Sequence, residues 1–150
     1  MRVVLQRVTE AAVRVDDAVV GEIGPGLVAL VGIGSGDLAA DVDALAAKTA
    51  ALRIFDTADG ARCVADVAGA ILVISQFTLL ADTRRGNRPS WTGAASPDHA
   101  RPLVERFATN LEDRGITVAR GIFGAHMVVS LVNDGPVTIV LDREGAKSTK

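Results

Sequence analysis

Residues 71–91 have the sequence ILVISQFTLLADTRRGNRPSW and contain the most informative pattern of the chain. The first four residues are apolar and mostly β-branched, which is typical of a strand buried on both faces of a sheet. The polar side chains of Ser75, Gln76 and Thr78 follow, so we expect the strand to end where a cleft can form. Three arginines and Trp91 come next, and positive charge beside an aromatic ring suits a phosphate or a nucleobase. A solvated basic loop is the alternative interpretation of these residues.

The composition indicates one domain with a high fraction of apolar residues. The chain has 150 residues, of which 49% are apolar, and its mean hydropathy is +0.31. No apolar run has the length of a membrane span, so we expect part of the apolar surface to be buried in an oligomer. The residues after Met1 lack a secretory signal pattern, and the single cysteine, Cys63, fits a reducing cytoplasm. The formal net charge of −2 restricts any nucleic-acid binding to a local basic patch.

The chain offers few residues for a thiol, metal or cofactor site. Cys63 is expected to be a small buried hydrophobe, because His99 and His126 are distant from it in sequence. One cysteine, two histidines and no tight acidic cluster predict no metal site. The glycines of residues 32–36 have the spacing G-x-G-x-G, not G-x-G-x-x-G, and the strand before them is expected to belong to a hairpin series. A flexible turn is therefore preferred, with a nucleotide-cofactor enzyme as an alternative.

The order of expected elements predicts an α+β fold in a single domain. Helices are expected at residues 38–52 and 97–114, each with an apolar stripe, capped by Asp37 and Ser96 respectively. The first three strands are expected to form an antiparallel meander. The strands are predicted at residues 2–15, 19–23, 27–33, 62–67, 71–74, 116–120, 127–132 and 137–141.

Arg7 is a charged residue on the otherwise inward-facing side of the first expected strand. A buried arginine needs hydrogen-bond partners, because unpaired burial costs several kcal/mol. Two interpretations remain open from the residues alone. Either the strand twists so that Arg7 emerges at an edge, or Arg7 supports a site.

Five short segments carry a family signature. They are SQFTL at 75–79, NDGPVT at 133–138, QRV at 6–8, RPS at 88–90 and FGA at 123–125. With these segments at this spacing, the chain closely resembles the D-aminoacyl-tRNA deacylase family, also called D-tyrosyl-tRNA deacylase. The resemblance covers the domain expected over residues 1–142 and leaves 143–150 as a polar tail. Many members carry Phe after the Arg-Pro-Ser run, where this chain has Trp91.

The resemblance implies a homodimer of compact, barrel-like α+β domains with two main helices. Family members hydrolyse the ester that joins a D-amino acid to the 3′-terminal adenosine of tRNA, spare L-aminoacyl-tRNA and also remove glycine. The implied partners are thus tRNA carrying a D-amino acid or glycine and a second copy of the chain, with no membrane and no cofactor. The active site lies at the dimer interface, where Gly135-Pro136 of one subunit, with a cis peptide bond, enters the pocket of residues 75–78 of the other.

The backbone of Gly135 and Pro136 is expected to check chirality. Glycine permits close approach and proline has no N–H, so their carbonyl oxygens can fix the α-ammonium of the substrate. An ordinary turn with a trans proline is the alternative. Arg7 is expected to brace this pair by donating to its carbonyls.

Thr78 is expected to position the substrate, because no base lies near it in sequence; a base supplied by the fold would make it a nucleophile. The N–H groups of Phe77 and Thr78 would polarise the ester carbonyl, while the terminal 2′-hydroxyl of tRNA helps to activate water. Ser75 and Gln76 are expected to bind the adenosine or orient the ester. Phe77 and Met127 either line the pocket or belong to the core.

Arg84, Arg85 and Arg88 are the candidates for contacts with the phosphates of the tRNA acceptor stem. The same basic loop also fits a different function, a non-catalytic nucleic-acid-binding dimer. That alternative predicts affinity for DNA or RNA without ester cleavage.

Overall fold

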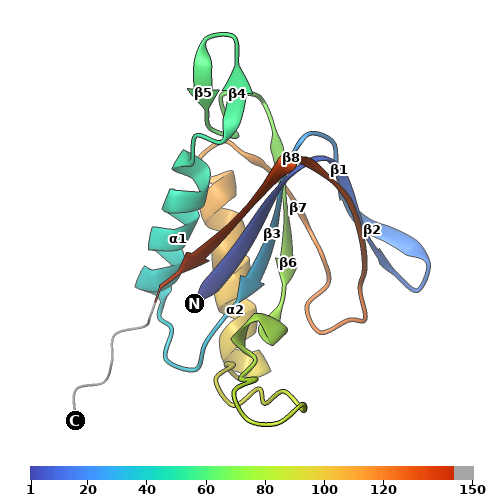
Figure 1. Cartoon of the computed structure of the whole chain (residues 1–150), viewed down its shortest axis with the longest axis vertical. Helices are drawn as coiled ribbons and strands as arrows, with labels where there is room; N and C mark the ends of the chain where they lie inside the picture. The colour runs from blue at the N-terminus through green and yellow to red at the C-terminus, as the bar shows by residue number, and fades with distance from the viewer. Residues whose placement is uncertain (144–150) are drawn as a thin grey trace.

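The sheet is organised around strand β1, which pairs with β8 along one edge and with β2 and β3 along the other (Figure 1). The computed structural model describes residues 1–143. Beyond β3 the sheet continues through β6 and β7, which are parallel to their neighbours. The strands of this sheet are β1 (Arg2–Val15), β2 (Ala18–Ile23), β3 (Gly26–Gly32), β6 (Ala70–Ser75), β7 (Thr117–Arg120) and β8 (Val128–Asp142).

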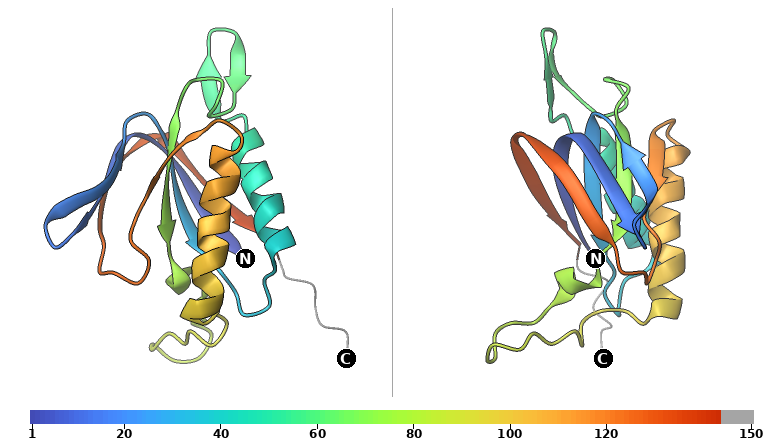
Figure 2. Two further views of the ribbon diagram at one scale, coloured as in Figure 1. Left: turned by 180° about the vertical axis from the view of Figure 1, so that it is seen from behind. Right: turned by 90° about the vertical axis from the view of Figure 1, so that its right-hand side faces the viewer.

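Two helices, α1 (Ala39–Ala51) and α2 (Pro97–Glu112), lie side by side on one face of the sheet (Figure 2). A short 3₁₀ helix, η1 (Phe77–Leu80), follows β6 at one end of the molecule. A small hairpin of β4 (Phe55–Thr57) and β5 (Gly60–Arg62) stands at the opposite end (Figure 1). None of the helices in residues 1–143 is long and apolar enough to cross a membrane.

The curled sheet separates two apolar clusters. The cluster facing the helices contains Val3, Leu27 and Phe107, and the cluster on the inner face contains Val13 and Leu72. Strand β2 approaches β7 so closely that a Cβ at Gly21 would collide with the carbonyl oxygen of Arg120. The sheet therefore nearly closes on itself, which confirms the α+β, barrel-like prediction with two main helices.

The prediction that the first three strands form an antiparallel meander is wrong, because β2 and β3 both pair with β1 and not with each other. Ala11 pairs with Ile23 and Val8 pairs with Gly26, so β2 and β3 lie in line along the same edge of β1. The break between them falls at Pro25, which has no N–H to donate to β1. Strand β3 is also parallel to β6 and is connected to it through α1, so the expectation that it belongs only to a hairpin series is wrong as well.

Strand β6 is buried on both faces, as its apolar run predicts. The strand expected at 62–67 is wrong: β5 ends at Arg62, and a turn follows that buries Val64. The two strands expected at 127–132 and 137–141 are one strand, β8, because the chain bulges between them without leaving β1. Of the expected tail at 143–150, all but Arg143 lies outside the described residues.

Asp37 does not cap α1 as expected. Its carboxylate Oδ1 lies 2.6 Å from the buried ammonium of Met1, and its Oδ2 accepts the N–H of Gly34 at 2.5 Å. A buried cation needs a counter-charge, and this outweighs a helix cap. Asp41 takes over the capping role, since its Oδ2 accepts the N–H of Leu38 at 2.9 Å. That hydrogen bond, together with the nearby Arg143 guanidinium, lowers the pKa of Asp41.

Candidate active site

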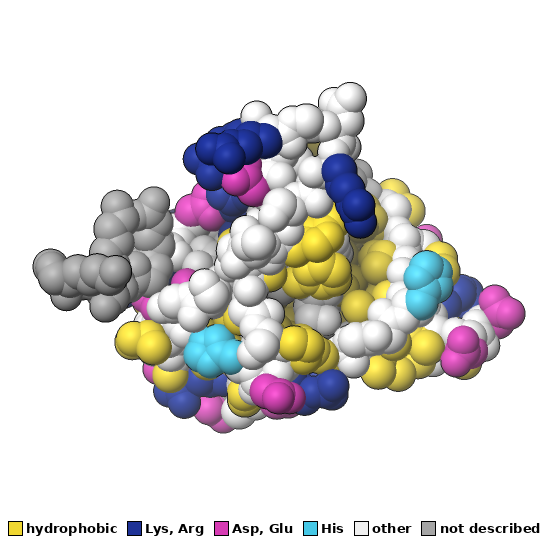
Figure 3. Space-filling view, turned by 90° about the horizontal axis from the view of Figure 1, so that it is seen from below, with side chains coloured by type: hydrophobic (Ala, Val, Ile, Leu, Met, Phe, Trp, Pro, Cys, Tyr) yellow, Lys and Arg dark blue, Asp and Glu magenta, His cyan; other side chains and the backbone are white. Residues whose placement is uncertain are grey.

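The residues after β6 line a cavity of about 550 Å³ at the carboxyl end of this central strand. Ser75 ends β6, and the N–H of Gln76 still bonds to the carbonyl of Val31 at 2.8 Å. The opposite wall comes from the start of α2 and from the segment that follows β7. Figure 3 looks onto this end of the molecule, where hydrophobic side chains gather in a hollow with Lys or Arg side chains at its rim. The cavity is mostly apolar with a few polar groups, which is typical of a small-ligand site.

Two aromatic side chains line this cavity and remain partly open to solvent. Phe77 is 56% exposed and Trp91 is 42% exposed. Their rings meet edge to face, with centroids 5.6 Å apart and an interplanar angle of 78°. Phe77 therefore lies at the cavity and not in the core. Exposed aromatic rings of this kind offer stacking surfaces to a nucleobase.

Thr78 has no basic partner in the described residues. Its hydroxyl accepts a hydrogen bond from the Nε2 of Gln76, and an amide N–H cannot take up a proton. His99, a possible base, is bonded through Nε2 to the carbonyl of Asp37 at 2.9 Å instead. The backbone N–H groups of Phe77 and Thr78 make no hydrogen bond within residues 1–143. This geometry provides two free amide donors but no activated nucleophile.

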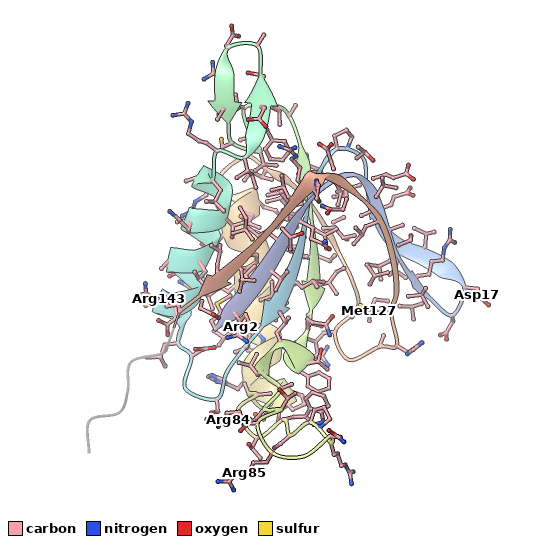
Figure 4. All side chains as sticks on the ribbon, viewed as in Figure 1. Arg2, Asp17, Arg84, Arg85, Met127 and Arg143 are labelled. Carbon is pink, nitrogen blue, oxygen red and sulfur yellow. The ribbon has the colours of Figure 1, made fainter. Side chains whose placement is uncertain are left out.

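The basic loop is closed by two backbone hydrogen bonds between Asp82 and Ser90, of 2.8 and 3.0 Å. The guanidinium of Arg84 binds both carboxylate oxygens of Asp82, at 2.9 and 2.7 Å, and lowers the pKa of Asp82 to about 2. Arg85 and Arg88 are exposed and form no ion pair in the described part of the chain. Figure 4 shows Arg84 and Arg85 on this loop, beyond η1. The three arginines thus differ, because Arg84 already has a counter-charge.

The Gly135-Pro136 pair forms a bulge in β8. Gln6 pairs with Thr138 and Val8 with Asn133, so four residues of β8 lie opposite one residue of β1. The residues 1–143 contain no cis peptide bond, so the cis bond implied by the resemblance is wrong for this structure. The trans form of an X–Pro bond is favoured by ~0.5–1 kcal/mol, and the strand continues through the pair. Gly135 has φ of +115°, which a glycine tolerates at low cost, and both residues are exposed.

Arg7 is mostly buried, with 12% of its side chain exposed, and it contacts three groups at the bulge and the β4–β5 hairpin. Its Nε lies 3.0 Å from Asp134 Oδ2 as an ion pair without hydrogen-bond alignment. Its Nη1 donates to the carbonyl of Ile54 and lies 3.5 Å from Asp56 Oδ2. The expected bonds to the carbonyls of the Gly135-Pro136 pair are not formed among the described residues. Arg7 instead forms its ion pair with the neighbouring aspartate, because a carboxylate attracts a guanidinium more strongly than a carbonyl does. Its Nη2 also packs directly against Gly135, where a Cβ would lie only 2.7 Å from it.

Within one chain the bulge and the cavity are far apart. Arg7 is in register with Leu27 and Ile71, so the bulge lies three strand spacings across the sheet and four residues along it from Ser75. At ~4.8 Å per strand and ~3.3 Å per residue, the separation is roughly 20 Å. The structure thus brings residues 75–78 together but does not bring the bulge to them.

Met127 lies on the segment that leads into β8, away from the basic loop (Figure 4). It is partly buried, packs against the inner apolar cluster and does not line the cavity of its own chain. Phe123 lines the cavity, and Arg101 lines an adjoining hollow that Phe123 shares; neither was among the expected site residues. The Arg101 guanidinium lies 4.7 Å from the centroid of the Phe123 ring, a contact that residues far apart in sequence make only in the folded chain.

The glycine-rich turn at residues 32–36 does not provide a phosphate site. The N–H of Gly34 is bound by Asp37 and the N–H of Ser35 by the carbonyl of Gly93 at 3.1 Å. A phosphate would meet the carboxylate of Asp37 in place of free amide donors. Within residues 1–143, no three His, Cys, Asp or Glu side chains are grouped to hold a metal ion.

Comparison with known proteins gives the family. A family model described as D-Tyr-tRNA(Tyr) deacylase matches residues 4–142. The chain belongs to this family. It is 57% identical over 144 residues to a D-aminoacyl-tRNA deacylase of Roseiflexus castenholzii, with 95% of this chain and 92% of the relative covered. It is 56% identical to the protein of the same name from Deinococcus radiodurans, with 95% and 99% covered.

Membership of this family identifies the protein as a hydrolase of ester bonds. A solved structure named c-Myc DNA Unwinding Element Binding Protein has the same fold. Its TM-score is 0.90 at 35% sequence identity, and the match covers 96% of this chain and 99% of that one.

Proposed function

We propose that the protein hydrolyses the ester between a D-amino acid and the 3′-terminal adenosine of tRNA, and that it rejects L-aminoacyl-tRNA. The observation that carries this proposal is the cavity beyond β6. Ser75, Gln76 and Phe77 line this cavity together with Trp91, and the N–H groups of Phe77 and Thr78 have no hydrogen-bond partner among residues 1–143. The family to which the chain belongs is one of deacylases. An ester carbonyl and a nucleobase require donors and stacking surfaces of this kind.

In the proposed reaction, water attacks the carbonyl carbon of the ester. The N–H groups of Phe77 and Thr78 stabilise the oxyanion that develops, and the terminal 2′-hydroxyl of the tRNA assists the transfer of the water proton to the departing 3′-oxygen. The products are a free D-amino acid and tRNA. Thr78 acts as a positioning residue, since its hydroxyl is held by an amide. Thr78→Ala should therefore keep turnover within about tenfold of the wild type, whereas complete loss of turnover with intact tRNA binding would restore the nucleophile role.

A homodimer completes the proposed site. Strand β8 pairs only with β1 in the described chain, so its other edge is free. Several apolar side chains of β8 are exposed, which suits burial against a second copy. They are Val128, Val129, Val132 and Val140. In the dimer, the exposed Gly135-Pro136 bulge of one subunit enters the cavity of the other and fixes the α-ammonium through its carbonyls. Because the protein's backbone carbonyls contact only the α-ammonium, the side chain of the amino acid is not recognised, and glycyl-tRNA is also a substrate.

The tRNA itself is held in this proposal by the basic loop. Arg85 and Arg88 are exposed and form no ion pair within residues 1–143, so they contact the phosphates of the acceptor stem. A tRNA substrate places the protein in the cytoplasm, where it removes D-amino acids before translation.

The experiment compares matched D-tyrosyl-tRNA and L-tyrosyl-tRNA incubated with the purified protein in EDTA, and measures release of the amino acid. We expect rapid loss of the D-ester alone, without a metal requirement. Equal stability of both esters would refute the proposal.

A second candidate, a nucleic-acid-binding dimer without catalysis, is favoured by the name of the solved structure at 35% identity. It predicts binding of single-stranded DNA or RNA and no release of amino acid from either ester. The same two esters, combined with a DNA-binding titration, therefore distinguish the two functions.

A further inference from the structure

Arg101 lies on α2 next to a second cavity, which adjoins the one described above. This second cavity has a volume of about 460 Å³, and its lining includes Arg101, Glu105, Arg120, Ser75 and Phe123. Ser75 and Phe123 also line the first cavity, so the two hollows share a wall. A ligand whose ester lies at Ser75 therefore has Arg101 as a close cationic neighbour.

Of the carboxylates one turn from Arg101 on α2, Glu105 is bound by Arg120, and Asp98 forms no ion pair among residues 1–143. Glu105, one helical turn further along α2, lies 3.0 Å from Arg120, and Glu112 lies 2.7 Å from the same guanidinium. The hydrogen bond from Arg120 lowers the pKa of Glu112, so this carboxylate remains ionised and paired with Arg120. Arg101 itself forms no ion pair among residues 1–143 and is exposed. Within the described part of the chain, Arg101 is thus a cation without a paired carboxylate beside a mostly apolar hollow.

A cation–π contact with Phe123 holds the Arg101 guanidinium. Its central carbon lies over the Phe123 ring, 4.7 Å from the ring centroid. A planar fork of donors held in this way matches two oxygens of a phosphate. Arg84 differs, because the donor edge formed by its Nε and Nη2 already binds both carboxylate oxygens of Asp82.

We propose that Arg101 binds the phosphodiester on the 5′ side of the terminal adenosine. The inference rests on the proposed function, in which the scissile ester is attached to the 3′-oxygen of that nucleoside. The 3′-oxygen and the 5′-phosphate of one nucleotide are separated only by its ribose, and Ser75 and Arg101 line the same hollow. Arg101 is thus a positioning residue for the substrate, which places the ester against the N–H groups of Phe77 and Thr78.

The test measures binding of adenosine and of adenosine 5′-(methyl phosphate), which carries the single charge of a phosphodiester. Trp91 is the only tryptophan of the chain and lines the first cavity, so its fluorescence reports occupancy. We expect the wild type to prefer the phosphate by about tenfold, as for a hydrogen bond to a charged group. Arg101→Ala should abolish the preference, and Arg101→Lys should restore part of it, because lysine keeps the charge but not the planar fork.

The matched control is Arg106→Ala on the same helix. Arg106 is exposed and paired with Asp43 at 2.6 Å, away from either cavity, so its removal should leave the phosphate preference unchanged. A wild type that binds both ligands equally, or binds neither, overturns the assignment of Arg101. So does an Arg101→Ala variant that weakens both ligands by the same factor, since that result indicates a structural role.

Hydrolysis of D-tyrosyl-tRNA by the wild type is measured in parallel and separates the two proposals. Hydrolysis without an Arg101-dependent phosphate preference leaves the proposed function standing and overturns the assignment of Arg101. An Arg101-dependent preference without hydrolysis supports the phosphate site and refutes the deacylase function.

Discussion

Replacing Arg7 with methionine tests whether the brace at the β8 bulge controls stereochemical selection. The substitution removes the guanidinium that contacts Asp134, Asp56 and the carbonyl of Ile54, and keeps most of the apolar stem. Under the proposed function, the bulge carries the carbonyls that examine the α-ammonium. A looser bulge should therefore accept the L-ester more readily, with a smaller effect on hydrolysis of the D-ester.

The expected loss of stability follows from the exposure of the partners. Breaking a fully buried ion pair costs ~3–5 kcal/mol. Arg7 is 12% exposed, but Asp134 is 47% exposed and Asp56 is 86% exposed, so both carboxylates regain water when the guanidinium is removed. We therefore expect a loss of only ~1–2 kcal/mol, which lowers Tm by ~2–8 °C for a domain of this size. The variant should remain folded at 25 °C, so its selectivity can be measured.

The assay measures initial rates of release from D-tyrosyl-tRNA and L-tyrosyl-tRNA, with Tm from thermal melts. If the contacts of Arg7 contribute ~1.4 kcal/mol to the discrimination between the two esters, their removal changes the D/L rate ratio by about tenfold. Arg14→Met is the matched control, because Arg14 lies on the same strand, is exposed and forms no ion pair among residues 1–143. It should leave the D/L ratio unchanged. An unchanged ratio in Arg7→Met, with the Tm lowered as expected, would refute the reasoning and leave Arg7 a purely structural role.

Three further predictions concern stability, pH and salt. Asp37→Asn removes the counter-charge of the buried Met1 ammonium, so the free energy of unfolding should fall by ~3–5 kcal/mol in denaturant titrations; a loss below ~1 kcal/mol would contradict the ion pair. The lowered pKa of Asp41 stabilises the fold above its ordinary value of 3.8, and this contribution is lost as the pH falls through the lower pKa of the folded state. The Asp41→Asn variant should thus have a lower free energy of unfolding than the wild type at pH 7, and this free energy should fall less on acidification. Parallel profiles of the free energy of unfolding against pH for the two proteins would refute this role. Arg88→Ala should reduce the slope of log K against log salt for tRNA binding by ~1, and Arg84→Ala by less, because Arg84 is already neutralised; equal slopes would count against the distinction.

The elements were predictable where the pattern of one segment determines its burial. The apolar run of β6 and the stripes of α1 and α2 are examples, since each requires one particular environment. The partners of β2 and β3 were not predictable, because alternating apolar and polar residues indicate a strand but do not indicate which strand lies beside it. Asp37 shows the same limit: its position favours a helix cap, but an ammonium 36 residues away binds it instead.

The site was predictable in its local parts only. Ser75, Gln76 and Phe77 do line a cavity beyond β6, because a buried strand that ends in polar residues places them at the core boundary. The cation–π contact of Arg101 with Phe123 joins a helix to a loop after β7, and nothing in either segment alone indicates it. The aspartate that Arg7 contacts depends likewise on the bulge register of β8, which only the folded sheet defines.

The pairing of β1 with β8 also has a consequence for synthesis on the ribosome. Arg2 bonds to Asp142, 140 residues later, so the first strand to leave the ribosome acquires its last neighbour only when nearly the whole chain has been made. At ~5–20 residues per second, one edge of β1 stays open for roughly 7–28 s. Nascent chains stalled before β8 should therefore remain protease-sensitive, and resistance at that stage would show that the strand is not needed. An open apolar edge of this duration is a natural binding site for a chaperone during translation.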